Sequence, residues 1–304
     1  MNAAPHIFTL TGNLLAERTF EYVAWAPGKT QRAVSETFQV GGKGINVSKM
    51  LTRLGAANTA LCFTGGAAGV ECETWLEKHQ FSYRSFTTER GTRVGTVIRG
   101  PNYPETTFLG PDISPSPDAI AECVAFLDAQ PDGQILACCG SFPGWSGAEF
   151  DPLRNALDRW LGRGLLVVDT YGPPLAWLAQ RGVALIKINA TEARTLFGEV
   201  ETLDRALASH VASRTVTRWV VSDGPEMLIF RDGLNGKVET MKPPSVQEIS
   251  ATGSGDVLFA VVIHSLFLSQ TSLREALEKA VPLAAANAAN PGIAEFPESF
   301  APRD

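Results

Sequence analysis

Short apolar runs recur along the chain, and longer segments with helical periodicity lie between them. The runs are rich in Val, Ile and Leu, and most lack the polar alternation of a strand with one wet face. They are therefore typical of strands that are covered on both faces. They lie at His6–Leu10, Thr59–Phe63, Gln134–Cys138, Leu165–Asp169, Ala184–Ile188 and Arg218–Ser222.

Helix signals fill several of the intervals between these runs. Ile45–Leu54 places apolar residues on one face and ends at a glycine, and Pro117–Ala129 follows a serine that suits an N-cap. Leu273–Asn290 follows a capping-box pattern and stops before Pro291-Gly292. The alternation of strand and helix predicts an α/β protein with a mostly parallel sheet between two layers of helices.

Two segments, Phe20–Val40 and Arg93–Leu109, interrupt this alternation. Both alternate polar and apolar residues around turn signals, a pattern typical of antiparallel strands with one wet face. We therefore expect one unit over residues 1–304 and a small sheet inserted at residues 11–40 and 91–111, placed to act as a lid. A third hairpin, Met227–Arg231 with Lys237–Met241, is expected to extend the main sheet.

Composition restricts the class of protein. The 304 residues include 26 Lys+Arg and 32 Asp+Glu, a net charge of −6, and 44% are hydrophobic, which excludes global disorder. An acidic chain without a Lys/Arg run is a poor nucleic-acid binder, although local donors can still hold a small anion. No membrane span or signal peptide is visible, and the five cysteines include no C-x-x-C pair. We expect a cytoplasmic protein without disulfides or structural zinc.

The first candidate cluster is Gly41-Gly42-Lys43-Gly44-Ile45-Asn46, between an inserted strand and a helix. Glycines let the backbone approach a ligand, and a helix start directs free N–H groups at an anion. The alternative is an ordinary glycine turn with a solvated lysine. The spacing is not that of a Walker loop.

The second cluster, Ser250–Asp256, is a loop of small residues that precedes an apolar helix, and it also suits an anion. A carboxylate beside a bound phosphate is unexpected unless Asp256 accepts a hydroxyl proton as a general base. The alternative is that Asp256 is only a helix N-cap.

The third cluster, Lys187–Glu192, ends a buried strand. Oxygen ligands such as Asn189 and Glu192 suit hydrated Mg²⁺, but Asn189 or Thr191 is equally suited to an N-cap. Two loops, Gly140–Gly144 and Ser222–Gly224, follow other strands and could be plain turns. All of these clusters follow strands, where open α/β sheets bind ligands.

Taken together and in order, the motifs resemble the ribokinase-like carbohydrate kinases of the PfkB family, and most closely the branch of 1-phosphofructokinases and tagatose-6-phosphate kinases. The resemblance covers nearly the whole chain and implies a three-layer α/β/α ribokinase-like core with a small inserted β-sheet lid. The matching motifs are Gly41-Gly42-Lys43-Gly44-x-Asn46, Thr92-Arg93, Gly110-Pro111, Gly140-Ser141-x-Pro143, Lys187-x-Asn189-x-x-Glu192, Ser222-x-Gly224 and Gly253-x-Gly255-Asp256.

The resemblance implies phosphoryl transfer from ATP, with Mg²⁺, to a sugar or sugar-phosphate hydroxyl. Asp256 would be the base, and the backbone of Gly253, Ser254, Gly255 and Asp256 would form an anion hole. The metal would be ordered by Asn189 and Glu192, largely through water. Residues assigned to the nucleotide are Lys187, Asn189, Ser222, Gly224, Thr252 and Asn287.

The resemblance also assigns the acceptor site. The sugar would be held by Glu17, Gly41, Gly42, Lys43 and Asn46. A phosphate already on the substrate would suit Lys43, Arg93 and Ser141, because the guanidinium offers a bidentate fork. The lid would close over the sugar and exclude water, and in this branch it commonly pairs two subunits.

The chain departs from the branch at several positions. Glu17 stands where Asp is usual and Gly95 where Asn is usual, while Ile188, Ala251-Thr252 and Val261 are further changes. They bear on the substrate more than on the reaction. We expect a hexose-phosphate kinase, with fructose 1-phosphate or tagatose 6-phosphate as first candidates. Alternatives are a kinase of an unphosphorylated sugar or nucleoside and a non-catalytic sugar-phosphate sensor. A dinucleotide oxidoreductase lacks the G-x-G-x-x-G that should follow the first strand.

Overall fold

A nine-stranded sheet forms the centre of the molecule, with strand order β13-β12-β11-β10-β9-β8-β1-β4-β5. The computed structural model describes residues 4–101, 103–198, 202–210 and 215–297. Strands from β5 across to β11 run parallel, and β12 and β13 add an antiparallel hairpin at one edge. The strands are β1 (Ile7–Thr11), β4 (Asn58–Thr64), β5 (Tyr83–Thr87), β8 (Ile135–Gly140), β9 (Leu165–Thr170), β10 (Leu185–Asn189), β11 (Arg218–Asp223), β12 (Met227–Asp232) and β13 (Val238–Met241).

Each central strand is buried on both faces, as its apolar sequence predicts. In β8, Leu136 and Cys138 belong to one hydrophobic core, while Ile135, Ala137 and Cys139 belong to the core on the opposite face. Alternate side chains of a strand point to opposite faces, so an unbroken apolar run serves two cores at once. The predicted three-layer α/β/α fold with a mostly parallel sheet is confirmed.

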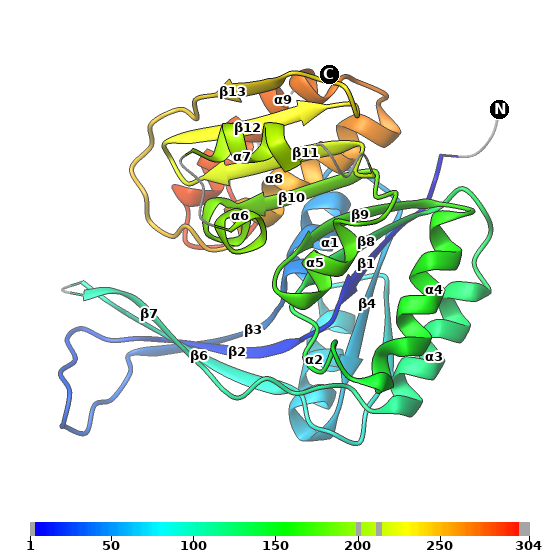
Figure 1. Cartoon of the computed structure of the whole chain (residues 1–304). Helices are drawn as coiled ribbons and strands as arrows, with labels where there is room; N and C mark the ends of the chain where they lie inside the picture. Colours follow the sequence, from blue (N-terminus) through cyan, green and yellow to red (C-terminus); the bar gives the residue numbers. More distant parts are fainter. Residues whose placement is uncertain (1–3, 102, 199–201, 211–214, 298–304) are drawn as a thin grey trace.

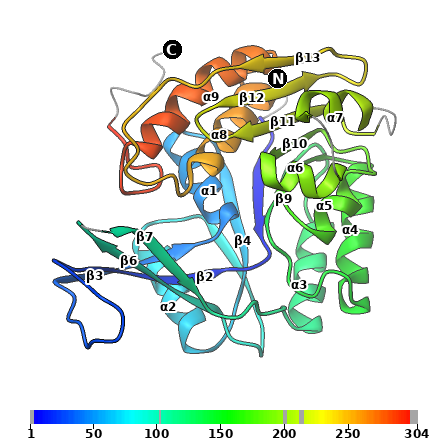
Figure 2. The same cartoon turned by 60° about the vertical axis from the view of Figure 1, so that its left-hand side comes forward.

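Two layers of helices cover the sheet, one on each face (Figure 2). One layer contains α3 (Pro117–Asp128), α4 (Asp151–Leu161), α5 (Pro173–Leu178), α6 (Ala190–Phe197) and α7 (Leu203–His210), with the 3-10 turn η1 (Ala148–Phe150) before α4. The other contains α1 (Lys43–Arg53), α2 (Gly66–Lys78), α8 (Ser254–Ile263), the π-helical turn η3 (His264–Leu268) and α9 (Leu273–Ala288).

A second sheet of four strands projects from the core (Figure 1). Its order is β3-β2-β6-β7, and it is built from β2 (Leu15–Glu21), β3 (Ser35–Gly41), β6 (Arg93–Gly100) and β7 (Tyr103–Leu109). Both hairpins are antiparallel, and β2 pairs with β6 in parallel register. Its first strand begins at Leu15, five residues before the alternating segment that starts at Phe20. Function as a lid stays a prediction.

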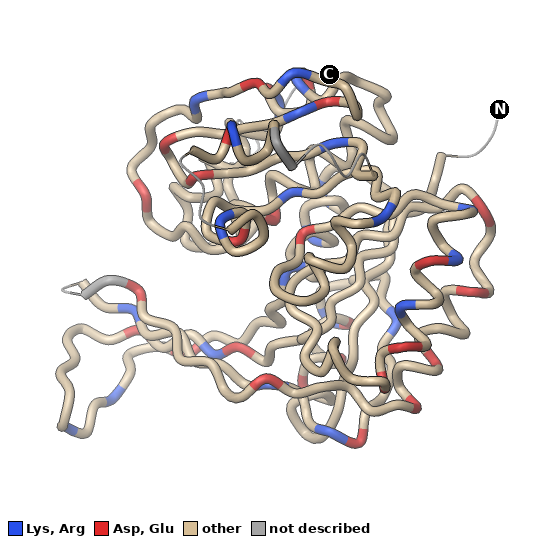
Figure 3. Tube along the Cα trace, viewed as in Figure 1, with Lys and Arg blue, Asp and Glu red and all other residues tan. Residues whose placement is uncertain are grey.

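Several elements differ from expectation. The helix expected from Ile45 already begins at Lys43, and the last helix ends at Ala288 instead of Asn290. As expected, Lys and Arg are interspersed with Asp and Glu along the described part of the trace (Figure 3). No helix in the described ranges has the length and apolar character that a membrane crossing requires.

Candidate functional site

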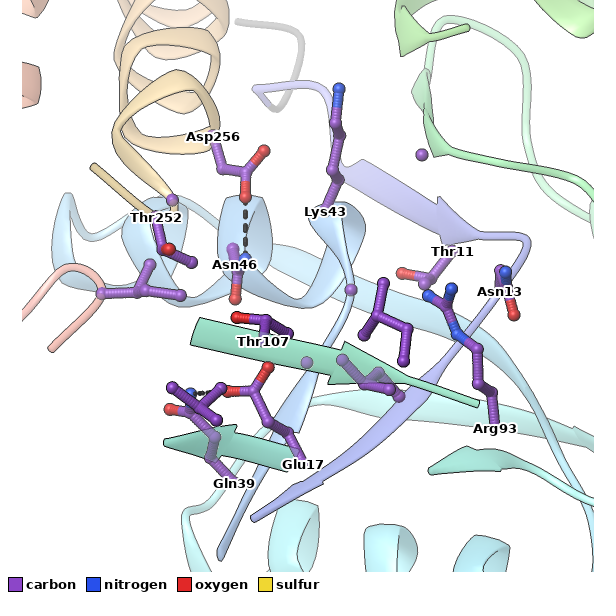
Figure 4. Close-up of a pocket in the computed structure, with 18 of the residues that line it drawn as sticks. Thr11, Asn13, Glu17, Gln39, Lys43, Asn46, Arg93, Thr107, Thr252 and Asp256 are labelled. Atoms are coloured by element: carbon purple, nitrogen blue, oxygen red, sulfur yellow. Dashed lines mark hydrogen bonds between the residues drawn. The ribbon is translucent and has the colours of Figure 1, made fainter. Parts of the chain in front are cut away.

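A cavity of about 280 Å³ lies where the carboxyl ends of the central strands face the second sheet. Its walls come from segments far apart in the sequence (Figure 4). The predicted residues that line it are Glu17, Gly41, Gly42, Lys43, Asn46, Arg93, Ser141, Thr252, Gly253 and Asp256. Polar lining residues that the sequence did not single out include Thr11, Asn13, Gln39, Arg99, Glu105, Thr107 and Tyr171.

Asp256 reaches the cavity from the first turn of α8. Gly253 is the N-cap of this helix, so Asp256 is the third helical residue and not the cap. Its carboxylate Oδ2 accepts a hydrogen bond of 2.7 Å from Asn46 Nδ2 (Figure 4). Burial raises the pKa of Asp256 to about 6, and the nearby Asp169 carboxylate adds to this rise. The structure thus excludes the capping alternative for Asp256.

The loop before α8 presents free backbone donors. Gly253 has a left-handed φ of 77°, and a Cβ there would lie 2.5 Å from a side-chain carbon of Ile293, so only glycine fits. Within the described chain, the N–H groups of Gly253 and Gly255 donate to no protein acceptor, whereas that of Ser254 bonds to Ala251 O. Free N–H groups at a helix start form a site for an anion.

Asn287 supports this loop from behind. It is fully buried, and its Nδ2 donates to Thr252 O at 3.0 Å and to Ser254 Oγ at 3.1 Å. Its Oδ1 accepts from Ala294 N at 2.8 Å. Every polar atom of the side chain therefore already has a protein partner. Its predicted direct contact with a nucleotide stays a prediction.

A buried ion-pair network lies beneath the cavity. Asp169, at the end of β9, is fully buried and bridges Lys43 Nζ at 2.6 Å and Lys187 Nζ at 2.8 Å. Burial alone would raise the pKa of Asp169, but Lys187 and Lys43 outweigh burial and lower it. Sequence reasoning missed Asp169, although a carboxylate that ends an apolar strand is a detectable signal. A Cβ at Gly255 would lie 2.6 Å from Lys187 Nζ, so a larger residue there would require Lys187 to shift within its ion pair with Asp169.

Asn189 is the N-cap of α6, one of the two alternatives that the sequence offered, and Glu192 completes a capping box with it. Asn189 Oδ1 accepts from Glu192 N, and Glu192 Oε2 accepts from Asn189 N, both at 2.8 Å. Glu192 Oε1 also lies 3.2 Å from Lys43 Nζ. Among described residues, no group of three or more His, Cys, Asp or Glu could hold a metal by itself. The oxygens present fit Mg²⁺ only as partial ligands that share it with water and phosphate.

Cationic and polar donors gather at another part of the cavity. Asn13 Nδ2 donates to Ser141 Oγ at 3.0 Å and to Asp112 Oδ1 at 2.8 Å. Arg93 Nη1 donates to the same Asp112 oxygen at 3.0 Å. Arg93 Nε is buried without a hydrogen-bond partner among described residues. Figure 4 shows Arg93 and Asn13 away from Asp256, so the cavity has a distinct donor-rich end.

The second sheet contributes the remaining wall. Glu17 on β2 is 8% exposed and accepts a hydrogen bond from Gln39 on β3, its neighbour in the strand register (Figure 4).

The Thr11 hydroxyl, at the end of β1, is buried and, in the part of the chain that is described, has no hydrogen-bond partner. Ser222 and Gly224 lie beyond the cavity, near the end of β11, so a nucleotide would have to extend toward them from α8.

Comparison with known proteins decides the family. The model of the family described as "pfkB family carbohydrate kinase" matches residues 15–299. The chain belongs to the PfkB family. It is 25% identical over 295 residues to 1-phosphofructokinase of Borreliella burgdorferi, covering 95% of this chain and 94% of that protein. It is 26% identical over 297 residues to D-tagatose-1-phosphate kinase of Bacillus licheniformis, with 95% and 94% covered.

The fold of this PfkB protein matches that of solved members. The crystal structure of phosphofructokinase-2 from Escherichia coli superposes with a TM-score of 0.88 at 22% identity, covering 98% of this chain and 97% of that one. The protein is accordingly a carbohydrate kinase with the ribokinase-like architecture predicted from its motifs.

Proposed function

We propose that this PfkB protein is an ATP-dependent kinase that phosphorylates a hydroxyl group of a hexose phosphate. One observation supports this most: a single cavity holds a buried carboxylate beside a helix start at Asp256 and a separate donor-rich end at Arg93, which we take as the anion-binding end. A phosphorylated sugar that spans the two would place a free hydroxyl at Asp256.

The chemistry follows from these groups. Asp256 would accept the proton of the sugar hydroxyl. The oxygen of that hydroxyl would attack the γ-phosphorus of ATP, and the bond from this phosphorus to the bridging oxygen would break and release ADP. With a pKa near 6, the carboxylate is mostly ionised at neutral pH and more basic than an exposed one. The free N–H groups of Gly253 and Gly255 would stabilise negative charge on the transferred phosphoryl group.

A magnesium ion would be held at Asn189 and Glu192 together with the phosphates of ATP. Bound there, it would supply positive charge that neutralises those phosphates. Lys43, which is 26% exposed beside Glu192, adds a fixed positive charge on the same side of the cavity.

The identity of the sugar is a finer question. The two relatives above are named 1-phosphofructokinase and D-tagatose-1-phosphate kinase, and a further relative from Staphylococcus epidermidis is named tagatose-6-phosphate kinase. Ketohexose phosphates are therefore our first candidates, with fructose 1-phosphate and tagatose 6-phosphate as specific guesses. Glu17 is fixed by Gln39 and faces the cavity, where it can accept hydrogen bonds from sugar hydroxyls. Its extra methylene relative to Asp shifts that acceptor toward the substrate.

The test is ADP release across a panel of phosphorylated ketohexoses, the corresponding free sugars, ribose and adenosine. Asp256→Asn should reduce kcat about 10²- to 10⁴-fold while ATP binding is retained. The control is Asp128→Asn, which removes an exposed carboxylate paired with Arg159 at 2.6 Å, and it should leave kcat unchanged. Full activity of Asp256→Asn would refute its role as base.

A kinase of an unphosphorylated sugar is the second candidate, because Arg93 is already paired with Asp112. The variant Arg93→Ala distinguishes this candidate from a sugar-phosphate kinase. It should raise KM strongly if Arg93 binds a substrate phosphate, and it should change KM little if the substrate is neutral.

We further propose that two copies pair through the second sheet. Phe108 and Val94 on its outer face are 55% and 47% exposed, which is unusual for large apolar side chains in one small sheet.

All five cysteines are buried and free. The cytoplasmic location stays a prediction.

A further inference from the structure

Asp112 occupies a place that the proposed reaction does not use. It follows the Gly110-Pro111 motif just after β7, and its side chain is 58% exposed. Its Oδ1 accepts hydrogen bonds from Asn13 Nδ2 at 2.8 Å and from Arg93 Nη1 at 3.0 Å. Both donors line the cavity, so an exposed carboxylate of the chain engages the anion-binding end from its rim.

This carboxylate uses only part of the donor set. A well-matched carboxylate takes two parallel hydrogen bonds from a guanidinium, whereas Asp112 receives only one, from Nη1. Arg93 Nε is buried and unpartnered among the described residues. The Ser141 hydroxyl accepts from Asn13 and keeps its own hydrogen to donate. The unused donors fit a larger anion with more acceptor oxygens.

A phosphate monoester is such an anion. It carries a charge of about −1.5 to −2 and three acceptor oxygens, against one charge and two oxygens for Asp112. Both anions need Arg93 and Asn13, and they would repel each other at the same donors. A neutral sugar hydroxyl has no charge with which to displace the carboxylate.

We propose that Asp112 is a specificity-determining residue, a built-in carboxylate competitor for the donors that bind the substrate's phosphate. Only a dianionic phosphate displaces it, so Asp112 weakens the binding of every ligand at this end and excludes neutral sugars most strongly. This inference rests on the proposed sugar-phosphate kinase activity. It predicts that removing the carboxylate improves phosphate binding, which is the opposite of what the loss of a supporting residue would do.

The experiment compares wild type with Asp112→Asn, and with Asp112→Ala as a second variant. For the best phosphorylated ketohexose of the panel, KM should fall roughly twofold to fivefold, the factor that corresponds to the removal of one competing exposed ion pair. The Ki of inorganic phosphate as a competitive inhibitor should fall by a similar factor. The kcat should stay within about twofold, because Asp112 is remote from Asp256.

Two controls separate the outcomes. Asp128→Asn, which removes an exposed carboxylate elsewhere, should change neither KM nor Ki, and Arg93→Ala should abolish phosphate inhibition. An unchanged or raised KM in both Asp112 variants, with wild type active on a sugar phosphate, overturns the inference but not the proposed function; a raised KM would show that Asp112 only orients Arg93. If wild type neither phosphorylates nor binds any phosphorylated sugar, the proposed function fails and the inference with it.

Discussion

At the scale of single residues, two carboxylates that look alike in the sequence have different environments. Asp256 and Glu192 both lie near a helix start, and the sequence offers capping as the alternative for each motif, by Asp256 itself in one and by Asn189 or Thr191 in the other. Glu192 does cap, in a reciprocal box with Asn189. Asp256 is the third residue of its helix and contacts Asn46 instead, across 210 positions of sequence. That long-range contact and the position inside the helix distinguish Asp256 from an N-cap.

Asp256 should destabilise the fold above pH 6. Because its pKa is raised from 3.8 to about 6, the folded protein binds more protons than the unfolded one between these values. Stability contributed by this group is therefore lost as the pH rises through the window. Asp256→Asn should have a Tm a few degrees above wild type at pH 8, and the difference should shrink toward pH 4.5.

Thermal unfolding followed at several pH values checks this expectation. Stability is the better readout, since a substrate phosphate titrates near the same pH and would complicate an activity profile. Asp128→Asn serves as the control for the removal of a carboxylate. A Tm difference for Asp256→Asn that does not depend on pH would contradict the assigned shift.

Asp169 should be the most costly carboxylate to remove. Lys187 is 4% exposed, and Asp169 is its partner in the described ion pairs, so Asp169→Asn leaves a buried ammonium without its countercharge. We expect a loss of about 3–5 kcal/mol in the free energy of unfolding, measured by guanidinium denaturation. The double variant Asp169→Asn/Lys187→Met should recover part of this loss. A loss below about 1 kcal/mol in the single variant would show that the network is not a structural support.

At the scale of elements, the second sheet touches the loop that precedes α8. Glu105 on β7 holds Arg99 Nε at 2.7 Å and accepts weaker hydrogen bonds from Ser250 and Thr252. Arg99 Nη2 in turn donates to Pro291 O at 3.1 Å. The β6–β7 hairpin is thereby connected to the same loop whose glycines carry the N–H groups that are unpaired within the described chain.

Glu105→Gln should loosen this connection. The charged acceptor for Arg99 is lost, so we expect faster amide hydrogen exchange in β6 and β7 and a rise in substrate KM of a fewfold, with global stability little changed. Glu36→Gln is the matched control, because Glu36 pairs with Arg18 on β2 at 3.0 Å, away from the loop. Equal exchange in both variants would argue against a coupling between hairpin and loop.

At the scale of the whole molecule, the second sheet has two unlike faces. The strand register aligns Phe38, Arg18, Thr96 and Phe108 in one row on its outer face, whereas Glu17, Gln39 and Thr107 line the cavity on the inner face. The end of this face near α2 is covered by the core, since Ala16 and Val40 are buried and Arg18 pairs with Glu71, so the exposed part is the end that carries Val94 and Phe108. A second copy of the chain would cover it.

Phe108→Glu should therefore give a monomer where wild type is a dimer. A charge at the centre of an apolar contact is costly to bury. Light scattering coupled to size-exclusion chromatography measures the mass, which should halve. Leu234→Glu, an equally drastic change at a residue that is 38% exposed on the β12–β13 connection, should leave the mass unchanged. Wild type that is already monomeric at micromolar concentration would refute the proposed pairing.

The sequence by itself determined the layers and the position of the site, because both follow from local pattern. Strands that are buried on two faces are recognisable in the sequence as apolar runs. Glycine-rich loops at the strand ends indicate the edge of the sheet at which a ligand would bind. The edge strand β5, Tyr83–Thr87, was missed because its mixed polar sequence carries no such pattern.

Tertiary structure alone decided the electrostatics of the cavity. Asp169 meets Lys43 across 126 positions, and Asp112 meets Asn13 across 99. Charge–charge energies depend on distance and burial in space, and neither quantity is encoded in local sequence.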